Sequence, residues 1–172
     1  LIVEDLRIKY QGSPVPITLF SRERQPLSVA LLLDTSESTL GKVFRIRDAA
    51  RAFVHALEPD DRVRIGTFGD EIAISAAATG RRDVLDRVLL EELWPGGSTP
   101  LWNALDTGMS AVAREPGRRV VITVTDGENT ASLPGFTGTL ASVQRRAVAD
   151  DFMLYAIGME GGALSKAVVD LT

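Results

Sequence analysis

The chain has 172 residues, 45% of them hydrophobic, which is enough for one domain with a sizeable core. Its formal charge is −4 and its arginines adjoin one another only in isolated pairs, so we expect it not to bind nucleic acid. The absence of cysteine excludes disulfides, iron–sulfur clusters and thiolate zinc sites. No apolar stretch approaches the roughly 20 residues of a membrane-spanning helix, so we expect no membrane insertion by this segment.

Residues 1–26 are predicted to form an extended arm or a small hairpin. Two weakly alternating stretches, 5–10 and 15–20, flank Gln11-Gly12-Ser13-Pro14, which is typical of a turn. The sequence begins with leucine, not with a methionine and a signal-like segment, so we expect it to be part of a longer protein.

A continuous apolar run over 28–33 predicts a strand that is buried on both faces, as in a parallel sheet. The following segment predicts one helix that ends before Pro59, because its apolar residues recur at spacings of three and four. This apolar set consists of Leu40, Val43, Phe44, Ala50, Phe53, Val54 and Leu57.

The segments 62–68 and 71–77 flank Gly69-Asp70, a two-residue connection typical of an antiparallel hairpin, so one edge of the sheet should run backwards. Further helices are predicted over 84–89, 100–113, 140–149 and 163–171, and further strands over 119–125 and 152–157. The alternation predicts an α/β fold with a doubly wound, mostly parallel sheet, one antiparallel edge strand and helices on both faces.

Three separate segments supply oxygen donors where elements begin or end. Asp34-Thr35-Ser36-Glu37-Ser38 follows one buried strand, Thr125-Asp126-Gly127 follows another, and Gly96-Gly97-Ser98-Thr99 precedes a helix. Ligands of doubly wound sheets gather at the carboxyl ends of strands where the winding reverses, so we expect the two aspartates to face each other. Magnesium, manganese and calcium ions prefer oxygen donors, and magnesium in particular takes few protein carboxylates.

From about Leu27 onward the sequence resembles a von Willebrand factor type A (VWA) domain, the family that includes the integrin inserted domains. The resemblance rests on DTSES as the family's Asp-Xaa-Ser-Xaa-Ser, on the threonine of GGSTPLWNAL and on the aspartate of VTDGEN. It implies a Rossmann-like fold with a metal-ion-dependent adhesion site (MIDAS). The metal ligands would then be Asp34, Ser36, Ser38, Thr99 and Asp126.

The flanking phrases VALLLDTSES and VVITVTDGENT look most like the bacterial branch of the family, whose domains often occur in exported, periplasmic or cell-envelope proteins. The resemblance implies a domain over 27–172. The family sheet ends with another strand after the last helix, so we expect the domain to be cut short at its C-terminus.

The donor set predicts a non-enzymatic protein-binding module for adhesion or scaffolding. Two aspartates would neutralise Mg²⁺, or alternatively Mn²⁺ or Ca²⁺, while neutral hydroxyls leave the ion attractive to an Asp or Glu of a protein partner. One shared carboxylate gives little affinity, so further surface contacts are needed. Candidates for this rim are Glu37, Trp94, Ser98, Trp102 and Glu128.

Two alternatives stay open. One is a magnesium-dependent phosphatase or hydrolase with Asp34 as nucleophile, although Ser36 occupies the place where such enzymes have a second acid. The other is a structural VWA domain with an unused metal site, in which Asp34 and Asp126-Gly127 only form turns and Thr99 caps a helix. The single histidine, His55, offers little for a catalytic triad.

Overall fold

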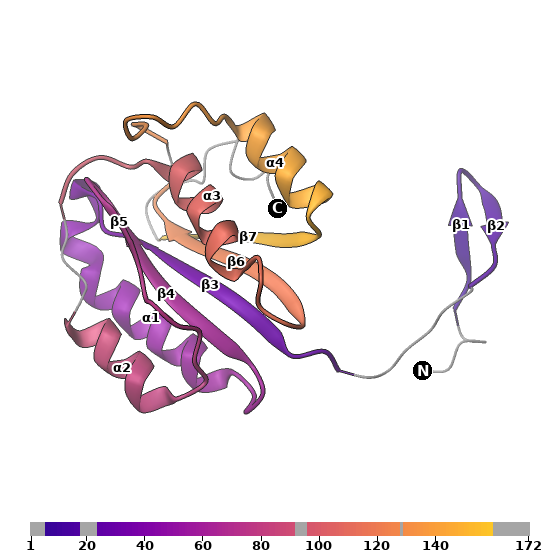
Figure 1. Cartoon of the computed structure of the whole chain (residues 1–172), viewed down its shortest axis with the longest axis horizontal. Coiled ribbons are helices and arrows are strands. Elements are labelled where there is room, and N and C mark those ends of the chain that lie inside the picture. Colours follow the sequence, from indigo (N-terminus) through magenta and orange to yellow (C-terminus); the bar gives the residue numbers. More distant parts are fainter. Residues whose placement is uncertain (1–5, 18–23, 92–95, 128, 160–172) are drawn as a thin grey trace.

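A computed structural model describes residues 6–17, 24–91, 96–127 and 129–159. Its main feature is a five-stranded sheet in the order β5-β4-β3-β6-β7 (Figure 1). The central strand β3 (Leu27–Asp34) pairs in parallel with β4 (Arg62–Phe68) and β6 (Arg118–Thr125), and β7 (Phe152–Gly158) pairs in parallel with β6. The edge strand β5 (Ile72–Ile74) is antiparallel to β4. The predicted mostly parallel sheet with one antiparallel edge is confirmed.

Helices cover both faces of this sheet. One face carries α1 (Val43–Ala56) and α2 (Arg82–Glu91), and the other carries α3 (Leu101–Val112) and α4 (Leu140–Ala149) (Figure 1). Successive side chains of a strand point to opposite faces, so β3 supplies Val29, Leu31 and Leu33 to one core and Ala30 and Leu32 to the other. This double burial explains the unbroken apolar run of β3.

The helix that the apolar spacing predicts over 40–57 is two elements. A 3₁₀ helix, η2 (Glu37–Lys42), precedes α1, and the two have different numbers of residues per turn, about 3.0 and about 3.6. The predicted apolar stripe therefore does not continue across the junction, and Leu40 is 53% exposed. Within α1 the buried face is formed by Val43, Ile46, Ala50 and Val54, and Phe44 lies off this face and is 75% exposed. The prediction was wrong for these two residues, and Ile46 packs in the core instead.

The connection between β4 and β5 has three residues instead of the predicted two. Phe68 pairs with Ile72, and the Gly69 N–H donates a hydrogen bond to the Glu71 carbonyl at 3.0 Å. The predicted antiparallel pairing is confirmed, and β5 is shorter than the sequence pattern indicated.

The N-terminal segment contains a small hairpin, which is one of the two structures predicted for it. Strands β1 (Ile8–Tyr10) and β2 (Ser13–Val15) form their own antiparallel two-stranded sheet. Gln11 and Gly12 make the turn with positive φ angles of 49° and 83°. The prediction was wrong for Ser13 and Pro14, which belong to β2 and not to the turn.

The helix predicted over 163–171 lies outside the described residues. Within the described parts of the chain, no helix combines the length and the apolar character that crossing a membrane requires. The direction of winding reverses at β3, because the chain passes through α1 to β4 on one side and later returns through α3 to β6 on the other. The carboxyl ends of β3 and β6 therefore lie side by side, and they position the candidate site.

Candidate functional site

Asp34 ends β3 as a fully buried carboxylate with a partner for each oxygen. The Ser36 N–H donates to Oδ1 at 2.9 Å, and the Thr125 hydroxyl donates to Oδ2 at 2.6 Å. Burial raises the pKa of Asp34 above its ordinary value, and the nearby Asp126 raises it further, while the hydrogen bonds from Ser36 and Thr125 oppose the rise. A carboxylate whose charge is costly to bury is one that a cation would stabilise.

Asp126 follows β6 directly and lies close enough to Asp34 to influence its ionisation. Its side chain is 16% exposed. Lys42, the last residue of η2, places its Nζ 3.6 Å from Asp126 Oδ2. This arrangement agrees with the expectation that the two aspartates lie near each other at the carboxyl ends of β3 and β6.

The two serines of the first motif lie together between β3 and η2. Ser36 Oγ and Ser38 Oγ are 3.1 Å apart, with Ser36 buried and Ser38 exposed. Ser36 stands at the N-terminal cap position of η2, but its hydroxyl makes no capping hydrogen bond. Both hydroxyls are neutral oxygen donors, which contact each other next to Asp34.

The glycine-rich segment before α3 is hydrogen-bonded to the first motif. The Glu37 N–H donates to the Gly97 carbonyl at 3.0 Å, and the Gly96 N–H donates to the Thr35 carbonyl at 2.6 Å. Gly97 has a φ of +85°, and a Cβ there would overlap the Asp70 side chain. Glycine is thus required for this close approach.

Thr99 is buried at the end of that segment, with 4% of its surface exposed. Its N–H donates to the Thr130 hydroxyl at 2.9 Å, and the Thr130 N–H donates back to its carbonyl at 3.0 Å. Because α3 begins at Leu101 with Pro100 at the cap position, Thr99 is not the helix N-cap that the sequence left open. The Thr99 segment is therefore hydrogen-bonded both to the first motif and to the chain that follows Asp126.

The residues proposed for the rim have mixed positions. Glu37 is exposed and Ser98 is half-buried. Trp102 is half-buried against the core under α3, and its backbone N–H donates to Asn129 Oδ1 at 3.1 Å. Trp94 and Glu128 lie outside the described residues.

His55 takes no part in this cluster. It lies near the C-terminal end of α1, where its Nε2 is 3.0 Å from Asp86 Oδ2 of α2.

Sequence reasoning missed the roles of Thr125 and Lys42. Thr125 reaches Asp34 because Leu33 pairs with Val124, which brings the next residue of each strand together. Lys42 reaches Asp126 from the last position of the 3₁₀ helix η2, directly before α1. The first contact depends on strand register and the second on a 3₁₀ helix. The one feature of the sequence that could have pointed to Thr125 was its position directly before Asp126.

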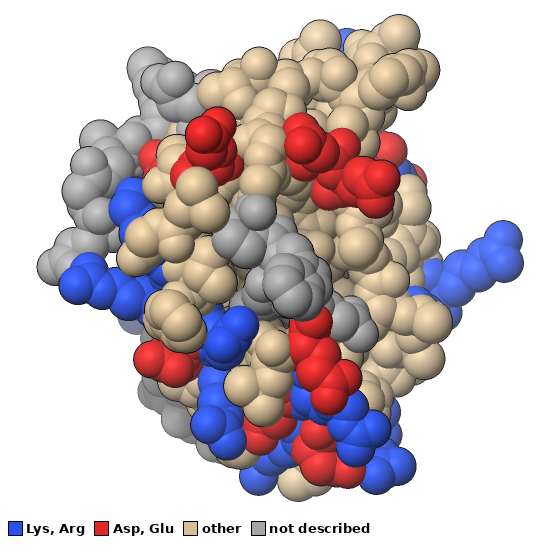
Figure 2. Space-filling view, turned by 90° about the vertical axis from the view of Figure 1, so that its left-hand side faces the viewer, with Lys and Arg blue, Asp and Glu red and all other residues tan. Residues whose placement is uncertain are grey.

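The donors suit a hard divalent cation. Within the described chain, no three His, Cys, Asp or Glu side chains cluster as a metal site of those residues alone would need. The candidate set instead combines two carboxylates with hydroxyls, which fits magnesium because that ion keeps several waters and takes few carboxylates. Figure 2 views the molecule from the side on which the carboxyl ends of the parallel strands lie, and acidic side chains are visible there.

A sequence model of the von Willebrand factor type A domain matches residues 29–128, which is more than half of the chain. The chain belongs to the von Willebrand factor type A family. No curated protein sequence matches this VWA chain at a significant level.

Solved structures with the same fold come from several organisms. Proximal thread matrix protein 1 from the mussel byssus, with a zinc-occupied MIDAS motif, has 17% identity and a TM-score of 0.69, over 86% of this chain and 39% of that chain. The vWF domain of the type V pili tip protein Mfa5 from Porphyromonas gingivalis has 19% identity and a TM-score of 0.58, over 68% and 43%. An aerotolerance-related membrane protein from Bacteroides fragilis has 16% identity and a TM-score of 0.62, over 83% and 78%.

At these identities the likeness shows the fold alone. The VWA chain spans less than half the length of the mussel and Porphyromonas structures.

Proposed function

We propose that this VWA domain is a non-enzymatic module that binds a divalent cation and, through it, a protein partner. Mg²⁺ is the expected ion, with Mn²⁺ or Ca²⁺ as alternatives. The proposed ligands are Asp34, Ser36, Ser38, Thr99 and Asp126. The observation that carries the proposal is the buried Asp34 carboxylate. It accepts a hydrogen bond on each oxygen, and Asp126 and the serine hydroxyls of the first motif lie near it.

The proposed partner presents an Asp or Glu to the cation. The two aspartates balance the charge of the cation, but the hydroxyl ligands are neutral and leave its Lewis acidity little reduced, so a carboxylate from outside can still bind it. Such an ion-mediated contact needs surrounding surface contacts to give useful affinity. We place these on the exposed Glu37, on the half-buried Ser98 and Trp102, and on the positions proposed for Trp94 and Glu128 from the sequence.

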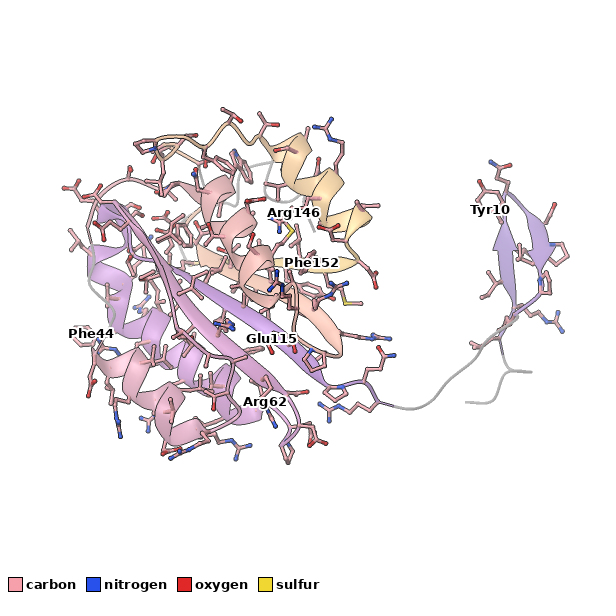
Figure 3. All side chains as sticks on the ribbon, in the orientation of Figure 1. Tyr10, Phe44, Arg62, Glu115, Arg146 and Phe152 are labelled. Atoms are coloured by element: carbon pink, nitrogen blue, oxygen red, sulfur yellow. The ribbon has the colours of Figure 1, made fainter. Side chains whose placement is uncertain are left out.

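We also propose two exposed apolar residues for this rim. Leu40 lies in η2, two residues after Ser38, and Phe44 lies in the first turn of α1. Phe44 lies on the outer side of the helix (Figure 3), with the Arg47 guanidinium 5.6 Å from the centre of its ring. Exposed aromatic and arginine side chains are frequent anchors of protein interfaces.

Asp34 is poorly placed for the alternative of a phosphatase. A nucleophilic carboxylate must reach its substrate, whereas Asp34 has no exposed surface and both of its oxygens accept hydrogen bonds. These features argue against a nucleophilic role for Asp34.

We further propose that the domain begins at Leu27, after an N-terminal arm over 1–26. The Leu27 N–H donates to Asp61 Oδ1 at 2.9 Å, which supports a boundary there. A location in an exported, periplasmic or cell-envelope protein is also proposed. It is supported by the pilus tip protein and the membrane protein among the structures of similar fold.

The test is a calorimetric titration of the metal-free domain with magnesium chloride. Wild type should bind one ion, and Asp126→Asn should weaken binding at least tenfold, because one of the two charges that neutralise the cation is lost. Asp86→Asn is the matched control, since this carboxylate contacts Arg51 and His55 elsewhere on the surface. Absence of binding to wild type by Mg²⁺, Mn²⁺ and Ca²⁺ would remove the proposal.

A further inference from the structure

Lys42 lies beside the proposed metal ligands although it is not a possible ligand of a cation. It is the last residue of η2 and the residue before α1, with φ −114° and ψ −5°. Its Nζ is 3.6 Å from Asp126 Oδ2, and the two side chains are 31% and 16% exposed. An ion pair that is largely shielded from solvent is less screened than one on the open surface.

The charges around Lys42 explain why an ammonium group is stabilised there. Asp34 and Asp126 repel each other when both are ionised, and this repulsion contributes to the raised pKa of Asp34. Among the ion pairs between described residues, Lys42 is the cation that reaches either of these carboxylates. It therefore reduces the negative charge at the place where a metal ion would bind.

We infer that Lys42 is an internal counter-ion of this site, which neutralises Asp126 in the metal-free domain and competes with the cation. The inference rests on the proposed function and concerns the affinity of the same site. A metal ion must displace the ammonium group from Asp126, and the remaining positive charge nearby continues to oppose binding. The lysine stem is long and flexible, so the group can leave without movement of the backbone.

Two consequences follow. Lys42 lowers the affinity for the cation below what the oxygen donors alone would give. It also stabilises the metal-free fold, because it reduces the repulsion between two carboxylates.

The test uses Lys42→Gln, which removes the charge and keeps a polar side chain. Calorimetric titration with Mg²⁺ should show a Kd about tenfold lower than that of wild type, which corresponds to about 1.4 kcal/mol. The melting temperature in chelator should fall by about 2–4 °C. Arg51→Gln is the control, since it removes a positive charge and an ion pair from α1 away from the site, and it should leave the Kd within about twofold.

Lys42→Arg keeps the charge and should behave nearly as wild type. If wild type binds Mg²⁺ and Lys42→Gln binds it equally well or more weakly, the inference is overturned. If wild type binds no metal, the proposed function fails, and the competition with a metal fails with it.

A double-mutant cycle then tests independently whether Lys42 stabilises the metal-free fold through Asp126. In the Asp126→Asn background, Lys42→Gln should no longer lower the melting temperature in chelator. An unchanged effect in that background would show that Lys42 does not act through Asp126.

Discussion

The substitution Asp34→Asn separates the role of Asp34 in metal binding from its role in the fold. Asparagine has the same shape, so its carbonyl can accept from the Ser36 N–H and its amide can donate to the Thr125 hydroxyl. The substitution therefore removes the buried charge with little change in packing. We expect the variant to fold and to lose magnesium binding.

The size of the effect follows from ligand linkage. At a magnesium concentration 100 times the Kd, binding stabilises the folded state by about 2.7 kcal/mol. For a domain of about this size, 1 kcal/mol raises the melting temperature by roughly 2–4 °C. Wild type should therefore melt about 5–11 °C higher with magnesium than with chelator, whereas Asp34→Asn should show no difference.

The pH dependence without metal has a defined sign. The folded-state pKa of Asp34 is raised above its ordinary value of 3.8, so the folded state binds the proton more tightly than the unfolded state. Well below pH 3.8 the carboxyl is protonated in both states, so its ionisation does not affect the free energy of unfolding. As the pH rises from there through the folded-state pKa, metal-free wild type should lose stability relative to Asp34→Asn, and the difference should then become constant.

Circular dichroism melting of both proteins, in chelator and in magnesium at several pH values, measures these differences. Asp86→Asn again serves as the control for loss of a carboxylate. A magnesium-induced rise that persists in Asp34→Asn would refute the role of Asp34 as a ligand. A metal-free variant less stable than wild type at neutral pH would show that the hydrogen bonds of the carboxylate outweigh the cost of burying its charge.

Three further predictions concern the ligand set and the packing. Thr99→Val should weaken magnesium binding about tenfold by calorimetry, whereas Thr107→Val, which removes a hydroxyl bonded only to the Asn103 carbonyl among described groups, should leave it unchanged. In urea denaturation, Phe44→Ala should change the free energy of unfolding by less than about 0.5 kcal/mol because the side chain is 75% exposed, whereas Ile46→Ala, 2% exposed, should cost about 2–5 kcal/mol. Gly97→Ala should cost at least about 1 kcal/mol in the same assay, since its φ is +85° and the added Cβ would overlap a neighbouring side chain. Equal effects within either pair, or a neutral glycine substitution, would contradict the geometry described above.

Most of the secondary structure could be predicted because its signals are local. The apolar run of β3 and the spacing within α4 each depend on residues close together in the chain, and both elements lie within one residue of their predicted bounds. The junction of η2 and α1 could not be predicted in this way. A 3₁₀ turn followed by an α-helix carries the same apolar residues as one longer helix, and only the packing shows that Leu40 and Phe44 face solvent.

The candidate site divides in the same way. The sequence by itself determined which oxygen donors the chain has and that Asp34 and Asp126 each follow a strand, because side-chain chemistry and apolar runs are written in the residue order. Only the tertiary structure decided that Thr125 would hold Asp34 and that Lys42 would approach Asp126. Contacts between residues 91 or 84 positions apart depend on strand register and helix geometry, which are properties of the packed sheet and not of any local segment.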